Sequence, residues 1–183
     1  RHLHHQTLFN WGAARWYECL IPIYWLYDRM PEDWLIDLCY RLRTQGMDYT
    51  KAFEPYRDQD WKRQWTFDTH VVNLAMCLKQ EALMARLTGE DPDAFALRAH
   101  ETLKRYHGMA VGHFTGDECV AGTSPVQGSE LCSVVEAMYS FEQLLAVGGN
   151  PHWADEAERL AFNALPATTS ADMWTHQYDQ MTN

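Results

Sequence analysis

Basic residues are scarce in this sequence, and long apolar runs are missing from it. The 183 residues include 15 Lys and Arg against 25 Asp and Glu, a formal net charge of −10 at pH 7. Nucleic-acid binding needs clustered cationic side chains, and no Lys or Arg stripe is present, so we expect no nucleic-acid partner. No apolar run approaches the roughly 20 residues of a membrane-spanning helix, and the opening Arg-His-Leu-His-His does not resemble a signal peptide. We expect no membrane partner and a chain in solution, with the cytoplasm favoured although no residue marks the compartment.

Cysteine is present in an odd number, which does not suit a disulfide framework. The five cysteines lie mostly within apolar helical patterns, so we expect reduced thiols in a core. Hydrophobic residues make up 46% of the chain, with eight Trp and nine Tyr, and this content excludes a disordered protein. We expect most of the Trp side chains to be buried.

Period-two alternation is also missing, whereas apolar residues recur at helical spacing. The pattern predicts an all-α fold, because no segment of comparable length alternates as a half-buried strand does. Pro and Gly residues separate the helical segments at the positions expected of helix starts and stops. The predicted helices span about 11–28, 32–46, 66–88, 92–108, 129–147 and 152–165.

The predicted helices pair into three hairpins with short turns inside each pair and longer connections between pairs. Segments 71–78 and 134–139 are apolar nearly all round, whereas 92–108 and 152–165 each have a charged face. The first helix of each hairpin is therefore expected on the inside and the second on the outside, as in part of an (α/α) barrel. We expect residues 1–183 to be a fragment of a single catalytic domain of this kind, with hairpins missing before it and more chain after it.

The most informative segment is 116–136, where a loop with Gly and Pro leads into an apolar helix. An acidic pair lies in the loop at Asp117 and Glu118, and the first turn of the helix carries Glu130 and Cys132. Loops place reactive side chains and helices hold them still, so Glu118, Glu130 and Cys132 could share one pocket. The simpler alternative is that Ser129 caps the helix and Cys132 is a small buried apolar residue.

In an (α/α) barrel, the long connections open at one end, so residues at the starts of the inner helices should meet there. Helix N-termini favour negative charge, which suits carboxylates and a thiolate. The side chains that we expect to meet are Trp11, Arg15, Trp16, Asp68, His70, Glu118, Glu130 and Cys132.

Four segments also carry a family resemblance. They are Thr-His-Val-Val-Asn-Leu-Ala-Met at 69–76, Gly-Asp-Glu at 116–118, Gly-Ser-Glu-Leu-Cys-Ser-Val-Val-Glu-Ala-Met-Tyr-Ser at 128–140, and Glu-Arg-Leu-Ala-Phe-Asn-Ala-Leu-Pro-Ala at 158–167. Here the sequence resembles the β-L-arabinofuranosidase-like enzymes of glycoside hydrolase family 127, over most of the chain from about residue 10. The resemblance implies an (α/α)6 barrel followed by β-domains.

The resemblance also implies a chemistry for the pocket. The family is understood to use a zinc-bound cysteine thiolate as nucleophile and a glutamate as general acid/base, and to release L-arabinofuranose with retention. On matching positions, Glu118 is the acid/base, and Glu130 and Cys132 are zinc ligands. His70 matches a sugar-binding histidine, and Tyr178 matches a substrate-facing tyrosine. The implied substrate is an L-arabinofuranoside or a related plant-cell-wall sugar.

Two protein ligands supply too little of a zinc coordination shell, which normally has four members. The family's other two ligands, one of them the nucleophile, form a Cys-Cys pair, and no cysteine follows Cys132 in this sequence. We expect those ligands downstream of Asn183; the alternative is that this protein has lost the chemistry. The segment alone is therefore expected to be inactive and to bind zinc poorly.

Two other functions also fit the sequence. One is a different (α/α)-barrel enzyme, such as a sugar epimerase or an unsaturated uronide hydrolase, which would use His70 and the carboxylates without metal. The other is a non-catalytic helical scaffold that binds carbohydrate or peptide. For any carbohydrate ligand, the aromatic rings placed to stack against a sugar are Trp11, Trp16, Trp61 and Trp65.

Overall fold

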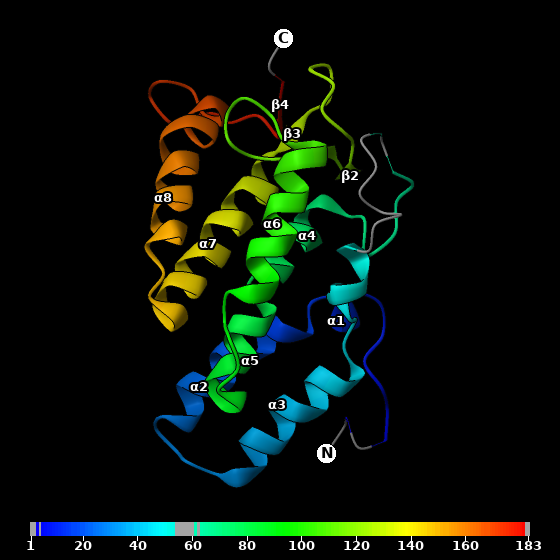
Figure 1. Ribbon diagram of the computed structural model, residues 1–183, viewed down its shortest axis with the longest axis vertical. Helices are drawn as coiled ribbons and strands as arrows, with labels where there is room; N and C mark the ends of the chain where they lie inside the picture. Colours follow the sequence, from blue (N-terminus) through cyan, green and yellow to red (C-terminus); the bar gives the residue numbers. More distant parts are fainter. Residues whose placement is uncertain (1–2, 4, 54–60, 62, 182–183) are drawn as a thin grey trace. The chain divides into compact units, whose positions relative to one another are not determined.

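A computed structural model describes residues 3, 5–53, 61 and 63–181 and contains two compact units (Figure 1). The units are Arg1–Tyr49 and Thr50–Asn183. Both are mostly helical, as the sequence predicts. Among the described residues, no helix is both long and apolar enough to cross a membrane.

The first unit is built from a broken helix and a longer one that packs beside it. The predicted helix 11–28 is interrupted at Arg15, where the backbone leaves the helical region (φ −118°, ψ 29°). Trp16 and Tyr17 follow the break and are fully buried, and the Tyr17 ring meets Tyr49 edge to face at 6.2 Å. The elements are α1 (Asn10–Ala14), the 3-10 helix η2 (Trp16–Cys19), α2 (Leu20–Tyr27) and α3 (Asp33–Gln45).

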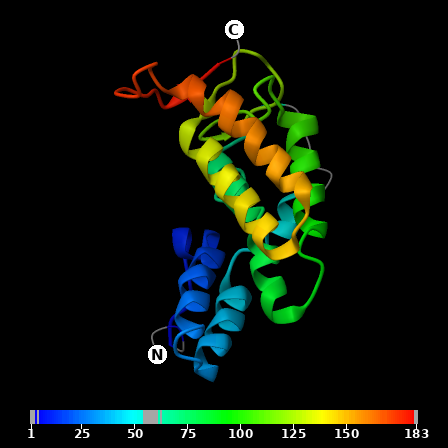
Figure 2. The same ribbon diagram turned by 90° about the vertical axis from the view of Figure 1, so that its left-hand side faces the viewer.

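The second unit contains the remaining helices, in which α7 packs against both α4 and α8 (Figures 1 and 2). Every residue of α4 is buried, as expected of a segment that is apolar nearly all round. The predicted helix 66–88 begins later than expected and is divided near Lys79. The bounds are η3 (Tyr49–Phe53), α4 (Val71–Cys77), α5 (Gln80–Thr88), α6 (Ala94–His107), α7 (Leu131–Gly148), α8 (Pro151–Arg159), the π-helix η5 (Leu160–Ala164) and η6 (Pro166–Thr168).

Gly and Asn residues define the turn between α7 and α8. Gly149 follows α7 in the left-handed conformation (φ +71°), which glycine adopts without strain. Asn150 then caps α8 by accepting a hydrogen bond from the His152 N–H at 3.1 Å. Asp93, just before α6, accepts hydrogen bonds from the side chains of Asn150 and Trp153, both at 2.8 Å. These contacts fix the start of α8 against the start of α6.

A small sheet, which the sequence did not predict, joins the loops at one end of the second unit. Its strands are β1 (Gly116–Asp117), β2 (Cys119–Val120), β3 (Ser129–Glu130) and β4 (Asp179–Gln180), in the order β2-β1-β3-β4. β1 is antiparallel to β2 and parallel to β3, and β3 is antiparallel to β4. The sheet therefore brings together loops that lie about 50 residues apart in the chain.

The expectation that most Trp side chains are buried is wrong. Trp16 and Trp153 are fully buried, and Trp153 stacks on Phe141 with ring centroids 5.5 Å apart. The burial of Trp16 also removes it from the rings that could stack against a ligand. The exposed rings are Trp11, Trp25, Trp34, Trp61, Trp65 and Trp174.

Candidate functional site

A buried carboxylate, Glu130, lies at the centre of the predicted site. It ends β3 and immediately precedes α7, and its side chain is fully buried. Its Oε1 accepts a short hydrogen bond from the backbone N–H of Glu118. Its Oε2 accepts from the Tyr178 hydroxyl at 2.8 Å and from the Cys132 thiol at 3.2 Å. Three donors therefore compensate for the burial of this carboxylate.

Glu118 occupies the tight turn between β1 and β2, with its side chain directed to solvent. The backbone is in the left-handed region (φ +67°), which is uncommon for a residue other than glycine and is typical of functional positions. Its N–H is bound by Glu130, and its carbonyl accepts from the Val71 N–H at 3.0 Å. The side chain is 61% exposed, so the carboxylate can reach a ligand in solution.

His70 is the N-cap of α4, and its ring orientation is fixed by that role. Nδ1 accepts a hydrogen bond from the Asn73 N–H at 3.3 Å, so the proton of the neutral ring is on Nε2. Nε2 lies 3.6 Å from Glu118 Oε2. The exposed ring of Trp65 meets the His70 ring edge to face at 6.1 Å. A carboxylate, an imidazole N–H and an aromatic ring therefore lie next to one another.

Tyr178 reaches the site because the C-terminal segment pairs with β3. The Tyr178 carbonyl accepts from the Leu131 N–H at 2.7 Å, and its hydroxyl lies 3.4 Å from Cys132 Sγ. Burial of the hydroxyl, followed by the contacts with Cys132 and Glu130, raises the pKa of Tyr178, so the hydroxyl stays protonated at neutral pH. Burial also raises the pKa of the Cys132 thiol, and Glu130 adds to the rise whereas Tyr178 opposes it.

The sequence reasoning named Asp117 but missed Asp179, which joins it beside this cluster. Asp117 precedes Glu118, and Asp179 follows Tyr178. Burial and then the nearby Asp117 carboxyl group raise the pKa of Asp179 to about 6. Gly128 leaves room for Asp117, because a side chain there would collide with an Asp117 carboxylate oxygen. The signal was present as an acidic residue next to Glu118 and another next to Tyr178.

The structure confirms the predicted meeting of His70, Glu118, Glu130 and Cys132, and it adds Tyr178 to them. Asp68, expected with them, accepts a hydrogen bond from Thr66 at 2.6 Å within its own loop. Trp11, Arg15 and Trp16 belong to the first unit, where the Arg15 guanidinium lies 4.6 Å over the Trp11 ring.

The alternative role for Ser129 is wrong. α7 begins after Glu130, and the buried Ser129 hydroxyl has no hydrogen-bond partner among the described residues. Ser129 instead contributes its backbone to β3.

The donor set of the cluster fits part of a zinc shell. Glu130 supplies a carboxylate oxygen 3.2 Å from the Cys132 sulfur, and carboxylate and thiolate are both zinc ligands. Within the described part of the chain, no group of three or more His, Cys, Asp or Glu side chains is arranged to hold a metal ion. Glu130 and Cys132 are therefore two neighbouring side chains of the types that bind zinc, fewer than the four that a zinc ion normally takes.

Comparisons with known proteins show a similarity of fold but no match in sequence. No protein-family model and no curated protein matches this sequence significantly. Among solved structures, the chain is similar to one described as a GH127 β-arabinofuranosidase, BT3674, with a TM-score of 0.58 and 18% sequence identity. The similarity covers 88% of this chain and 27% of that one, so this chain spans about a quarter of its length. At this identity, the similarity shows a shared helical fold.

Proposed function

We propose that this chain is part of the catalytic domain of a glycoside hydrolase, a retaining enzyme like the β-L-arabinofuranosidases. In this proposal the helices form about three of the six hairpins of an (α/α)6 barrel. The observation that carries it is the contact among His70, Glu118, Glu130, Cys132 and Tyr178, which come from three separate segments of the sequence. The similarity of fold to a GH127 structure supports the same assignment.

Glu118 has the geometry of a general acid/base. Its exposed carboxyl group can donate a proton to the leaving glycosidic oxygen and later accept one from the attacking water. The Nε2–H of His70, 3.6 Å away, stabilises the carboxylate that remains after the first transfer. The left-handed turn keeps the Glu118 carboxylate clear of Glu130, which is bound to the backbone of the same residue. The two glutamates therefore have different surroundings and different roles.

Glu130 and Cys132 would hold the zinc, with two further ligands from cysteines beyond the described residues. A bound zinc would keep a cysteine ligand in its nucleophilic thiolate form at neutral pH. His70 would orient the sugar through its Nε2–H, and Tyr178 would do so as an acceptor, because its hydroxyl hydrogen is donated to Glu130. Trp65, next to His70, offers an exposed ring face for the apolar side of the sugar.

A second candidate is an (α/α)-barrel carbohydrate enzyme that works by acid/base chemistry without metal. The pair Asp117 and Asp179 favours it, since the carboxyl group of Asp179, with a pKa of about 6, could act as an acid near neutral pH.

Metal content of two variants separates the candidates. In the complete polypeptide, Cys132→Ala should lose zinc together with hydrolysis of L-arabinofuranosides, because it deletes a ligand. Glu118→Gln should keep its zinc and lose only the hydrolysis, because Glu118 is not a proposed ligand and its backbone hydrogen bond to Glu130 survives the substitution. Equal zinc content in wild type and Cys132→Ala, measured by atomic emission, would contradict the ligand assignment, and activity after complete removal of metal would favour the second candidate.

A further inference from the structure

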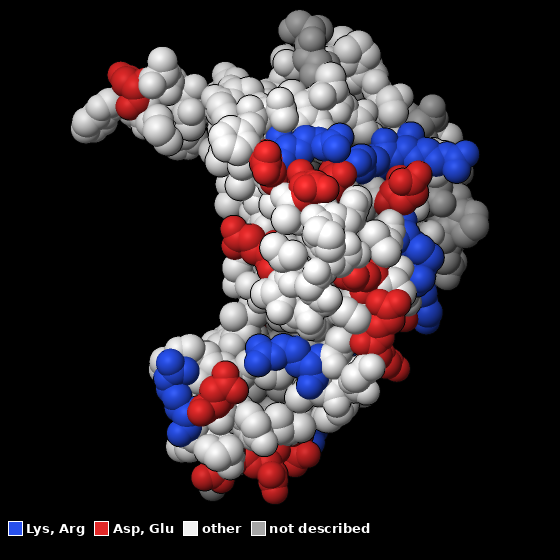
Figure 3. Space-filling view, turned by 60° about the vertical axis from the view of Figure 1, so that its left-hand side comes forward, with Lys and Arg blue, Asp and Glu red and all other residues white. Residues whose placement is uncertain are grey.

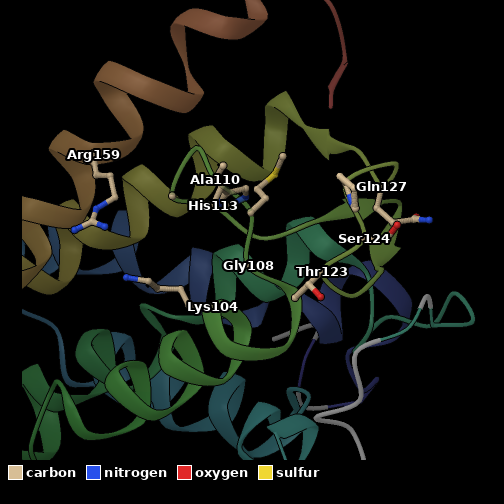
Figure 4. Close-up of a pocket in the computed structure, with 11 residues that line it drawn as sticks. Lys104, Gly108, Ala110, His113, Thr123, Ser124, Gln127 and Arg159 are labelled. Atoms are coloured by element: carbon tan, nitrogen blue, oxygen red, sulfur yellow. The ribbon is translucent and has the colours of Figure 1, made fainter. Parts of the chain in front are cut away.

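A cavity of about 440 Å³ lies in the second unit, and none of the five clustered residues lines it (Figure 4). Its walls come from the end of α6, the loop after it, the 123–127 loop and the end of α8. The volume falls within the roughly 300–1,000 Å³ of small-molecule sites. The lining contains two cationic side chains and no acidic one, which is unusual in a chain of net charge −10.

The cations, Lys104 and Arg159, come together at one end of the cavity (Figure 4). Lys104 Nζ donates to Oε1 of the buried Glu156 at 2.9 Å, and Arg159 Nη2 lies 3.8 Å from the same oxygen. One carboxylate thus faces two cations, and a net positive charge remains. Figure 3 shows one face of the molecule, with a band of Lys and Arg side chains across its upper part and several acidic groups below them.

Arg159 is held in position but keeps free hydrogen-bonding capacity. Gly112 has φ +93°, and a Cβ there would lie 2.6 Å from Arg159 Cδ, so the arginine stem packs directly over the backbone of this loop. Within the described residues, the guanidinium makes no hydrogen bond, and its contact with Glu156 is an ion pair at 3.8 Å. The planar guanidinium of Arg159 can therefore use these N–H groups to bind a carboxylate or phosphate through two hydrogen bonds.

The opposite end of the cavity is polar and uncharged. Thr123, Ser124 and Gln127 lie there, away from Lys104 and Arg159 (Figure 4). Hydroxyl and amide groups both donate and accept, and this property suits the hydroxyl groups of a sugar. The two ends together match a ligand with an oxyanion at one end and hydroxyl groups at the other.

We propose that this cavity binds a small anionic sugar, with its carboxylate or phosphate on Lys104 and Arg159 and its hydroxyl groups on Thr123, Ser124 and Gln127. The site is separate from the Glu118–Glu130 cluster, and binding there does not depend on the hydrolase function proposed above.

Calorimetric titration of the chain with glucuronate, glucose 6-phosphate, glucose and inorganic phosphate, at one ionic strength, tests the proposal. We expect saturable binding of at least one anionic sugar, at least about tenfold tighter than binding of glucose or inorganic phosphate. Arg159→Gln should weaken it about tenfold or more, because a charged hydrogen-bonding partner is lost. Arg105→Gln, the same change on an exposed residue of α6 outside the cavity, should leave it within about twofold.

Three results would overturn the proposal. They are binding of both anionic sugars no tighter than that of glucose, binding of inorganic phosphate as tight as that of the tighter anionic sugar, and equal losses in the two Arg variants. If Arg159→Gln fails to fold, amide chemical shifts of the wild-type chain provide the test. Shifts on adding the tighter anionic sugar should lie in 108–113 and 123–127, and shifts confined to other residues would refute the location.

Discussion

The left-handed turn at Glu118 predicts that glycine at this position stabilises the fold more than alanine does. Both backbone hydrogen bonds of Glu118, to Glu130 and from Val71, survive either substitution. Both substitutions also remove the same exposed contact with His70, which contributes at most about 1 kcal/mol. The difference in stability between the glycine and alanine variants therefore reports the cost of the backbone conformation alone.

The magnitude follows from two opposing terms. A left-handed conformation costs an L-residue roughly 1–2 kcal/mol that glycine does not incur, and the extra freedom of glycine in the unfolded chain costs about 0.5–1 kcal/mol. At φ +67°, Glu118→Gly should thus be more stable than Glu118→Ala by about 0.5–1 kcal/mol. Urea denaturation followed by circular dichroism measures this difference, provided the denaturant slope is unchanged. An alanine variant as stable as the glycine variant would show that the turn is not strained.

Two further predictions concern stability. Burial lowers the pKa of His100 to about 4 and of His113 to about 3. The unfolded chain takes up these protons below about pH 6.5, whereas burial keeps the folded chain from doing so. The free energy of unfolding should therefore decrease as the pH falls from 6.5 toward 4, by roughly 3 kcal/mol for His100. His100→Gln should flatten the dependence of the urea midpoint on pH, and an unchanged slope would refute this cause. Separately, Gly46→Ala should destabilise the chain by roughly 1–3 kcal/mol, because its Cβ would enter the buried Trp16 ring. Gly12 lies on α1, and a Cβ there would be 3.7 Å from its nearest neighbour, the Leu8 side chain, so Gly12→Ala should be neutral or slightly stabilising. Thermal melts measure both variants, and equal losses in both would contradict the packing argument.

The helices were predictable because apolar spacing and helix-end residues act locally. Pro151 and Gly149 mark the turn between α7 and α8 in the sequence as they do in the structure. The break at Arg15 was not predictable, because packing of the buried Trp16 overrides a continuous helical pattern there. The π-helix of 160–164 also interrupts a pattern that reads as an ordinary helix. The small sheet gave no signal, since strands of two residues are too short to show a period.

The sequence predicted those site residues that lie at the start of a helix. Glu130 and Cys132 are two residues apart, and His70 directly precedes its helix. Composition or spacing alone could not place Tyr178, which reaches the cluster only through the pairing of β3 with β4. The same long-range pairing brings Asp179 to Asp117.

The most direct test of the proposed hydrolase is the rate at which Glu118→Gln, in the complete polypeptide, hydrolyses an alkyl β-L-arabinofuranoside. The substitution preserves shape and removes proton donation, so the rate should fall by about two to four orders of magnitude relative to wild type. The loss should be smaller on an aryl arabinofuranoside, whose leaving group needs less protonation. A wild type without activity on either substrate, or a Glu118→Gln variant as fast as wild type on the alkyl arabinoside, would contradict the proposed role of this cluster.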